Sequence, residues 1–193
     1  MPRIEIYLNE ADKMRRKGEF EKAVEWLGRH LEEHEYSKKS KKDVFWRLRD
    51  ISERQMENRE FLQALNHYDS YLSLAESLLP FNEYKSAVFF AIKKCKWIID
   101  VQTSSNSFDI ARKYFSRIIN YGRRLDDTEV VDEILSYIVG KYIKEMERSV
   151  SAPPLLKKLK EETDTYIGMI KDSGLRDRLK NKKVVHDDDT QLY

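Results

Sequence analysis

Three features of the sequence predict an all-α fold built from antiparallel helix pairs, with about nine helices in all. Apolar residues recur at intervals of three and four along most of the 193-residue chain, which is the spacing of one helix face. Charged residues make up 36% of the chain, whereas Gly accounts for six residues and Pro for four. This composition suits long solvated helices and leaves few turn signals for a sheet. A short Phe-x-x-Ala motif also recurs along the chain.

Capping and breaking residues divide the N-terminal part into four expected helices. The first helix, 3–17, ends at Gly18, because glycine readily adopts the left-handed conformation that closes a helix. The second covers 19–35 and precedes a polar loop, YSKKSKK. The third covers 43–57, and a tight connection then leads into the fourth. Pro80 ends the fourth helix, since proline cannot continue a helix interior.

Five further helices are expected after Pro80. The turn TSSNS offers Asn106 or Ser107 as a helix cap, and RRLDDTEVV offers Asp127 or Thr128. The pair of prolines in SAPPLL suits the first turn of a helix, and Gly174 separates that helix from a short last one. The expected spans are about 82–103, 108–121, 128–148 and 175–182, and the helix that begins at the two prolines has an apolar face that extends to Ile170.

A Phe-x-x-Ala motif recurs in three of these helices. It appears as Phe20/Ala23, Phe61/Ala64 and Phe108/Ala111, with the alanines separated by 41 and 47 residues. A small residue lets two antiparallel helices approach closely, while larger apolar residues one turn away fill the flanks. We therefore expect the three alanines to be buried where helices cross. The alternative is a helical bundle without a repeat.

The stretch RKGEFEKAVEWL at 16–27 resembles the tetratricopeptide repeat family, whose pattern is Trp-x-x-Leu-Gly-x-x-Tyr on a first helix and Ala-x-x-x-Phe on a second. The small residues Ala11 and Ser52 fit the first-helix pattern, whereas Glu10 and Ile99 depart from it. The closing proline is missing, and the intervals exceed the family's period of about 34 residues. The resemblance covers residues 1 to about 122. It implies a right-handed stack of helix pairs, a TPR-like α-solenoid, that binds a protein or peptide in its concave groove.

The expected organisation is a single helical-repeat domain over 1–183. Residues 1–122 would form three TPR-like helix pairs, and 123–183 would form capping helices that cover the last apolar face. The segment 184–193 carries too much like charge and too little apolar surface to fold alone. We expect it to be a loosely packed acidic tail.

Charge and hydropathy limit the classes of partner. The net charge is +2 and the two signs are interleaved, so no overall field attracts nucleic acid or anionic lipid. The longest apolar run, AVFFAI, is far shorter than the roughly 20 residues of a membrane span. The N-terminus lacks the apolar stretch of a signal peptide. These features predict a cytoplasmic protein with no membrane partner.

No motif in the sequence indicates catalysis or a cofactor. Neither a glycine-rich phosphate loop nor a serine elbow is present. The stretch HLEEH, from His30 to His34, resembles the His-x-x-Glu-His metal motif of inverted zincins. A catalytic site of that kind needs a third ligand and a large scaffold. We therefore interpret the histidines as a surface or partly packed pair, and we predict a protein that is not an enzyme and has no metal or cofactor.

The family resemblance places the partner-binding surface on the first helix of each pair. Carboxylate-clamp members hold chaperone C-termini with Lys and Asn where this chain has Leu8 and Asp12, which argues against that ligand. The expected function is a scaffold or adaptor for another protein, with Arg15, Arg16, Trp46 and Arg49 as binding hot spots. One alternative is a nucleic-acid-associated factor that uses basic and aromatic residues of the same groove, and another is a face that is merely solvated. The predicted binding residues are Asp12, Arg15, Arg16, Trp46, Arg49, Glu53, Lys93, Lys96 and Asp100.

Overall fold

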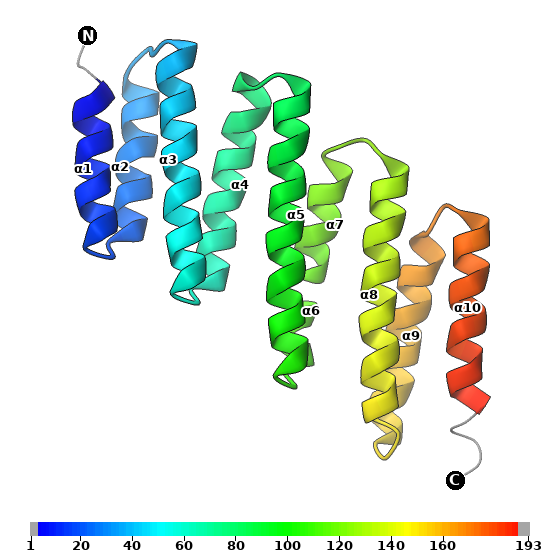
Figure 1. Ribbon diagram of the computed structural model, residues 1–193. Coiled ribbons are helices and arrows are strands. Elements are labelled where there is room, and N and C mark those ends of the chain that lie inside the picture. The colour runs from blue at the N-terminus through cyan, green and yellow to red at the C-terminus, as the bar shows by residue number, and fades with distance from the viewer. Residues whose placement is uncertain (1–3, 189–193) are drawn as a thin grey trace. The chain divides into compact units, whose positions relative to one another are not determined.

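A computed structural model describes the backbone of residues 4–188, and their side chains except those of Glu32 and 183–188. This range is all-α and contains no strand (Figure 1). The helices are α1 (Ile4–Arg16), α2 (Phe20–Glu33), α3 (Lys38–Glu57), α4 (Phe61–Leu78), α5 (Phe81–Ser104), α6 (Phe108–Arg112), α7 (Phe115–Arg123), α8 (Thr128–Arg148), α9 (Pro153–Met169) and α10 (Ser173–Asp188). They fall into two compact units, Met1–Ala91 and Ile92–Tyr193. Helix α5 contributes residues 81–91 to the first unit and 92–104 to the second.

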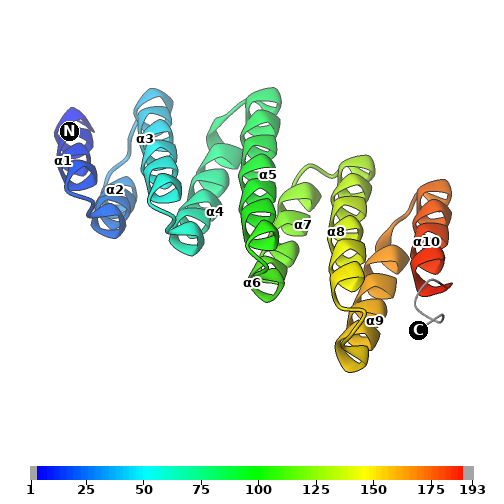
Figure 2. The same cartoon turned by 60° about the horizontal axis from the view of Figure 1, so that its bottom comes forward.

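Each unit consists of two layers of helices. In the first unit α1 and α3 lie in one layer and α2 and α4 in the other (Figure 2), and consecutive helices run antiparallel. In the second unit α8 and α10 lie in one layer, with α7 and α9 in the other. Pairs such as α3 with α4 and α8 with α9 pack along their lengths. The apolar faces predicted from the 3.6-residue period are therefore buried between the layers.

The same tight turn follows α1, α3 and α5. A residue with positive φ closes each helix: Gly18 at 78°, Arg59 at 64° and Asn106 at 55°. The next residue donates its backbone N–H to a carbonyl five residues earlier, over 3.0 Å to Met14, 2.9 Å to Gln55 and 2.9 Å to Gln102. These bonds satisfy carbonyls that the helix end would otherwise leave free. The three turns are spaced 41 and 47 residues apart, as are the three alanines.

The three motif alanines are fully buried, as predicted. Ala23, Ala64 and Ala111 each have a relative exposure of 0%. Each lies five residues after the positive-φ residue of its turn, so the spacing between the turn and the buried alanine is the same in all three cases. Burial of a small side chain at this position allows the helices of one layer to approach those of the other.

A buried polar cluster links α3 to α4 in the first unit. The His67 ring is nearly buried, and its Nδ1 lies 2.5 Å from Oε1 of Gln55. Its Nε2 lies 3.6 Å from a carboxylate oxygen of Glu21. Burial lowers the pKa of His67, and the carboxylates of Glu21 and Glu60 oppose that shift only in part. The imidazole is therefore held in its neutral form.

Two features of the second unit depend on close contacts around α8. Asp127 caps α8 by accepting from the backbone N–H groups of Glu129 and Val130. The buried Asp132 carboxylate accepts from the N–H groups of Lys171 and Asp172, at 3.0 and 2.8 Å. These two bonds attach the turn after α9 to α8. They give a buried carboxylate the partners that it needs.

Close packing of α7 on α8 leaves no space for a side chain at Gly122. A Cβ at Gly122 would lie only 2.6 Å from Cδ1 of Ile134. Real Cβ atoms essentially never approach another heavy atom this closely, so α7 and α8 pack around a residue that has no side chain.

Three helix boundaries differ from the sequence prediction. Of the expected loop at 36–42, residues 38–42 instead form the start of α3, because the Ser37 side chain accepts from the N–H of Ser40 and caps the helix. The single helix expected over 108–121 is two helices, since Lys113 and Tyr114 donate to carbonyls three residues earlier instead of four. The last helix continues to Asp188, so 184–188 of the expected tail are helical, and 189–193 lie outside the described residues.

Candidate binding pocket

An apolar pocket of about 220 Å³ lies between α3 and the first part of α5, within the first unit. Two of the predicted binding residues, Trp46 and Arg49, line it from α3. They are three positions apart, so one helix face presents both. The pocket is lined by Phe45, Trp46, Arg49, Tyr71, Leu79, Glu83, Ser86, Ala87 and Phe90.

The Arg49 guanidinium lies against two aromatic rings of this pocket. Its Cζ is 5.4 Å from the centroid of Trp46 and 4.2 Å from that of Phe90. Both distances lie within the range of cation–π attraction, which holds the group in place and shields part of it from water. Among the described residues, no carboxylate forms a salt bridge with Arg49. The pocket therefore presents a positive charge that its own walls leave unneutralised.

Tyr71 reaches the pocket from α4. Its ring is fully buried, and its hydroxyl donates to the carbonyl of Ala87 over 3.4 Å. Burial raises the pKa of Tyr71, although the nearby charge of Arg49 acts in the opposite direction. The phenol is thus neutral at ordinary pH and supplies an apolar ring surface to the pocket.

The rim of the pocket carries one neutralised acid and one exposed aromatic ring. Glu83 accepts from the ammonium group of Lys42 over 2.8 Å, which links the start of α3 to the start of α5. Trp46 packs edge-on against Phe45, with centroids 4.8 Å apart, and 42% of its surface remains exposed. The indole is therefore supported on one side and open to a ligand on the other.

Three other predicted residues of the first unit are used in contacts within the chain. Asp12 forms salt bridges with Arg15 at 3.2 Å and with Arg47 at 3.0 Å. Glu53 accepts from the hydroxyl of Tyr68. Their charges are thus largely satisfied, whereas Arg16 is exposed.

The remaining predicted residues belong to the second unit. The Tyr137 hydroxyl donates to Asp100 over 2.8 Å, and Asp100 also forms a salt bridge with Lys141. The Lys96 ammonium lies 5.2 Å from the centroid of the Tyr137 ring. Lys96 and Asp100 therefore connect α5 to α8, while Lys93 is exposed.

The sequence prediction missed Phe90 and Tyr71 as pocket residues. Phe90 follows Glu83 and Ala87 on one face of α5, and this spacing could have indicated it. Tyr71 lies on α4, and none of the predicted binding residues lies on that helix. Only the packing of α4 beneath α3 and α5 brings its ring to the pocket.

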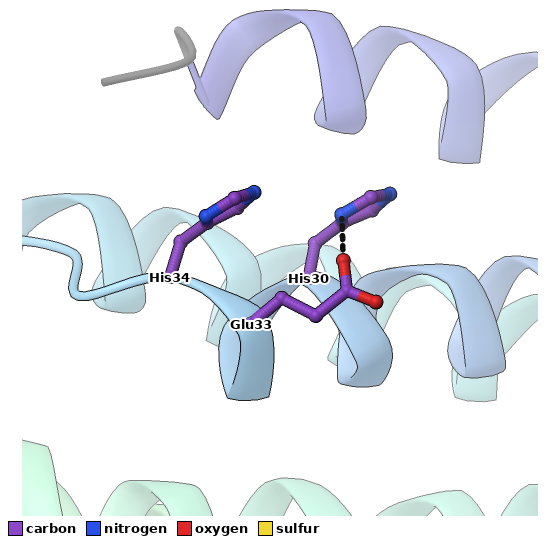
Figure 3. A group of neighbouring side chains, drawn as sticks. All are labelled: His30, Glu33 and His34. Atoms are coloured by element: carbon purple, nitrogen blue, oxygen red, sulfur yellow. Dashed lines mark ion pairs between the residues drawn. The ribbon is translucent and has the colours of Figure 1, made fainter.

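One group among the described side chains has the composition of a metal site. His30, Glu33 and His34 each offer a ligand atom, and these atoms lie within 4.8 Å of one another (Figure 3). The group lies at the end of α2, outside the pocket.

Two other hollows in the described part of the chain have no aromatic ring in their lining. A broad one of about 750 Å³ lies between α2 and α4 and is lined in part by serines. Another of about 300 Å³ lies near the start of α8. The described helices also include none with the length and apolar composition that crossing a bilayer requires.

Comparison with protein-family models, with curated proteins and with solved structures found no match to this chain.

Proposed function

We propose that this protein is a non-catalytic interaction module, a scaffold or adaptor, that binds an extended segment of a partner protein at the pocket between α3 and α5. The segment would place one large apolar side chain in the pocket and a neighbouring carboxylate on Arg49. The observation that carries the proposal is the Arg49 guanidinium, held between two rings without a carboxylate partner.

The size of the pocket favours a side chain over a cofactor. Its volume of about 220 Å³ is below the range of roughly 300–1,000 Å³ typical of small-molecule sites. A single aromatic or aliphatic side chain is a better match. Such anchors carry much of the binding energy at protein interfaces, where Trp and Arg are enriched among the hot spots.

The charge of the pocket favours an acidic partner segment. A hydrogen bond between a charged pair contributes about 1.5–3 kcal/mol when it is well desolvated. Arg49 is partly desolvated by its rings, and Glu83 on the rim is already paired with Lys42. A carboxylate next to the apolar anchor would therefore find an available cation, and the acid on the rim is already paired.

We further propose that the helix pairs form a divergent tetratricopeptide-like array with a right-handed stack. Support comes from the turn that recurs after α1, α3 and α5 at the spacing of the buried alanines. In that family the first helices of successive pairs line the binding groove, and α3 and α5 occupy that position here. The cytoplasmic location stays a prediction from the sequence.

A displayed library of random 12-residue peptides tests the proposal. Peptides enriched on the full chain should share a large apolar residue beside Asp or Glu. Arg49→Met and Trp46→Ala should each weaken the selected peptides at least about tenfold, which corresponds to 1.4 kcal/mol. Arg178→Met removes an exposed arginine of the second unit, far along the chain from the pocket residues, and serves as the matched control, so the affinity of this variant for the selected peptides should equal that of the wild type.

Two outcomes would contradict the proposal. One is a set of selected peptides whose affinity is the same for the wild type and Arg49→Met. The other is tight binding of single-stranded oligonucleotides, with a steep dependence on salt, in the absence of any selected peptide.

A further inference from the structure

We infer that His30, Glu33 and His34 form a binding site for a divalent transition-metal ion of the Zn²⁺ class at the C-terminal end of α2. This inference is independent of the peptide pocket, because the group lies on another helix and shares no residue with the pocket.

The spacing of two of the ligand atoms matches tetrahedral coordination. Nδ1 of His30 lies 3.3 Å from Oε2 of Glu33. Zinc bound to nitrogen and oxygen at about 2.0–2.2 Å, with tetrahedral angles, places neighbouring ligands about 3.3–3.6 Å apart. The ligand atoms of the three residues lie within 4.8 Å of one another. A small side-chain rotation of His34 would therefore complete three corners of the tetrahedron.

His34 is placed to supply the third ligand. His34 is the C-cap of α2, and its backbone is extended, with φ −137° and ψ 138°. Figure 3 shows the His30 and His34 rings projecting to the same side of the chain, and their planes differ by only 3°. The two imidazoles thus face a common volume, with the Glu33 carboxylate beside them.

Unsatisfied polar atoms gather at this corner of the molecule. Both ring nitrogens of His30 are buried without a hydrogen-bond partner among the described residues, and so is the Tyr36 hydroxyl. The contact between His30 and Glu33 is close enough for an ion pair but lacks hydrogen-bond geometry. The Tyr36 ring lies edge-on to His34, with centroids 5.8 Å apart. Buried polar atoms without partners are rare in proteins, and a bound ion is one established reason for them.

Aromatic neighbours hold the His30 ring in place, and the C-terminal end of α2 favours a bound cation. The His30 ring packs on Tyr7 at 3.8 Å between centroids and lies edge-on to Trp26 at 4.3 Å. This packing fixes the imidazole before any ion binds. The end of a helix carries the negative pole of its dipole, which stabilises a positive charge in the last turn.

The donor set selects the class of ion. Two imidazoles and a carboxylate suit Zn²⁺, Cu²⁺, Ni²⁺ or Co²⁺. Ca²⁺ and Mg²⁺ prefer sites made of oxygen ligands alone. Three protein ligands would leave a fourth position of the ion for water.

Competition for Zn²⁺ against a chromophoric chelator tests the inference on the full chain. The wild type should bind one equivalent, with Kd below about 10 µM, equivalent to more than about 6.8 kcal/mol. His34→Asn should weaken binding at least tenfold, and Glu33→Gln should weaken it less. Excess Ca²⁺ or Mg²⁺ should not compete.

Glu35→Gln provides the matched control, because Glu35 is an exposed carboxylate next to the group and is not part of it. Its affinity for Zn²⁺ should equal that of the wild type. Circular dichroism of each variant checks that the fold is kept, and a Zn²⁺-dependent rise in melting temperature should disappear in His34→Asn. Absence of saturable binding by the wild type would overturn the inference, as would unchanged affinity in a folded His34→Asn variant.

Discussion

The turn after α1 provides a test of the fold through two identical substitutions with opposite expected effects. Gly18 has φ of 78°, and a Cβ placed on it would meet no heavy atom within 4 Å. Gly28 lies inside α2, where an added Cβ would likewise meet nothing within 4 Å. Steric contact therefore contributes to neither substitution. The backbone conformation alone distinguishes Gly18→Ala from Gly28→Ala.

The difference in backbone conformation sets the expected change in the free energy of unfolding for each variant. A left-handed conformation costs a residue with a Cβ about 1–2 kcal/mol. The lower entropy of the unfolded alanine variant offsets about 0.4–1 kcal/mol of this cost. Gly18→Ala should therefore lower the free energy of unfolding by about 1 kcal/mol. Gly28→Ala should raise it by about 0.8–1 kcal/mol, because alanine is the better helix former.

Urea unfolding followed by circular dichroism measures both variants against the wild type. Both glycines belong to the first unit, so they report on the same unfolding transition. The expected separation between the two variants is about 2 kcal/mol. A neutral or stabilising effect of Gly18→Ala would contradict this expectation, since the turn would then not require a left-handed residue.

Other substitutions test the buried contacts. Burial lowers the pKa of His67 in the folded state, whereas in the unfolded state this pKa is about 6.5. Below pH 6.5 the unfolded state therefore binds more protons than the folded state does. The free energy of unfolding should accordingly fall as the pH drops below about 6.5. The difference between its values at pH about 7.5 and about 5.5 should be smaller in His67→Gln than in the wild type. Asp132→Ala should lower the unfolding free energy by about 3 kcal/mol, because it leaves two backbone N–H groups without a partner; Asp132→Asn, which keeps an acceptor, should cost less in the same urea assay. Ala64→Arg should lower it by several kcal/mol through overpacking and an unpaired buried charge, and an unchanged melting temperature would contradict the assigned crossing.

Much of the fold was predictable because some residues end a helix through their own backbone preferences. Gly18 and Pro80 end helices for local reasons, and the structure ends α1 and α4 close to them. The buried alanines were predictable because their period matches the helix pairs. The start of α3 was missed, because a run of lysines reads as a loop unless the cap at Ser37 is recognised. The break after α6 has no glycine or proline to indicate it.

The candidate pocket was only partly predictable from the sequence. Trp46 and Arg49 share one face of α3, so local spacing was enough to group them. Phe90 and Tyr71 come from other helices, and their positions depend on how α4 and α5 pack against α3. The salt bridges of Asp12 also depend on packing, because Arg47 approaches from a different helix. Side-chain spacing cannot show which charges are already paired.

Reversal of the charge at Arg49 is the strictest test of the proposal that this residue binds a carboxylate of a partner segment. A peptide selected by the wild type would be measured against Arg49→Glu, together with a second peptide whose acidic residue is replaced by lysine. Arg49→Glu should bind the acidic peptide at least about tenfold more weakly than the wild type does, a loss of 1.4 kcal/mol. It should bind the lysine peptide better than the wild type does. Equal affinity of both proteins for the acidic peptide, or no gain with the lysine peptide, would contradict the proposal.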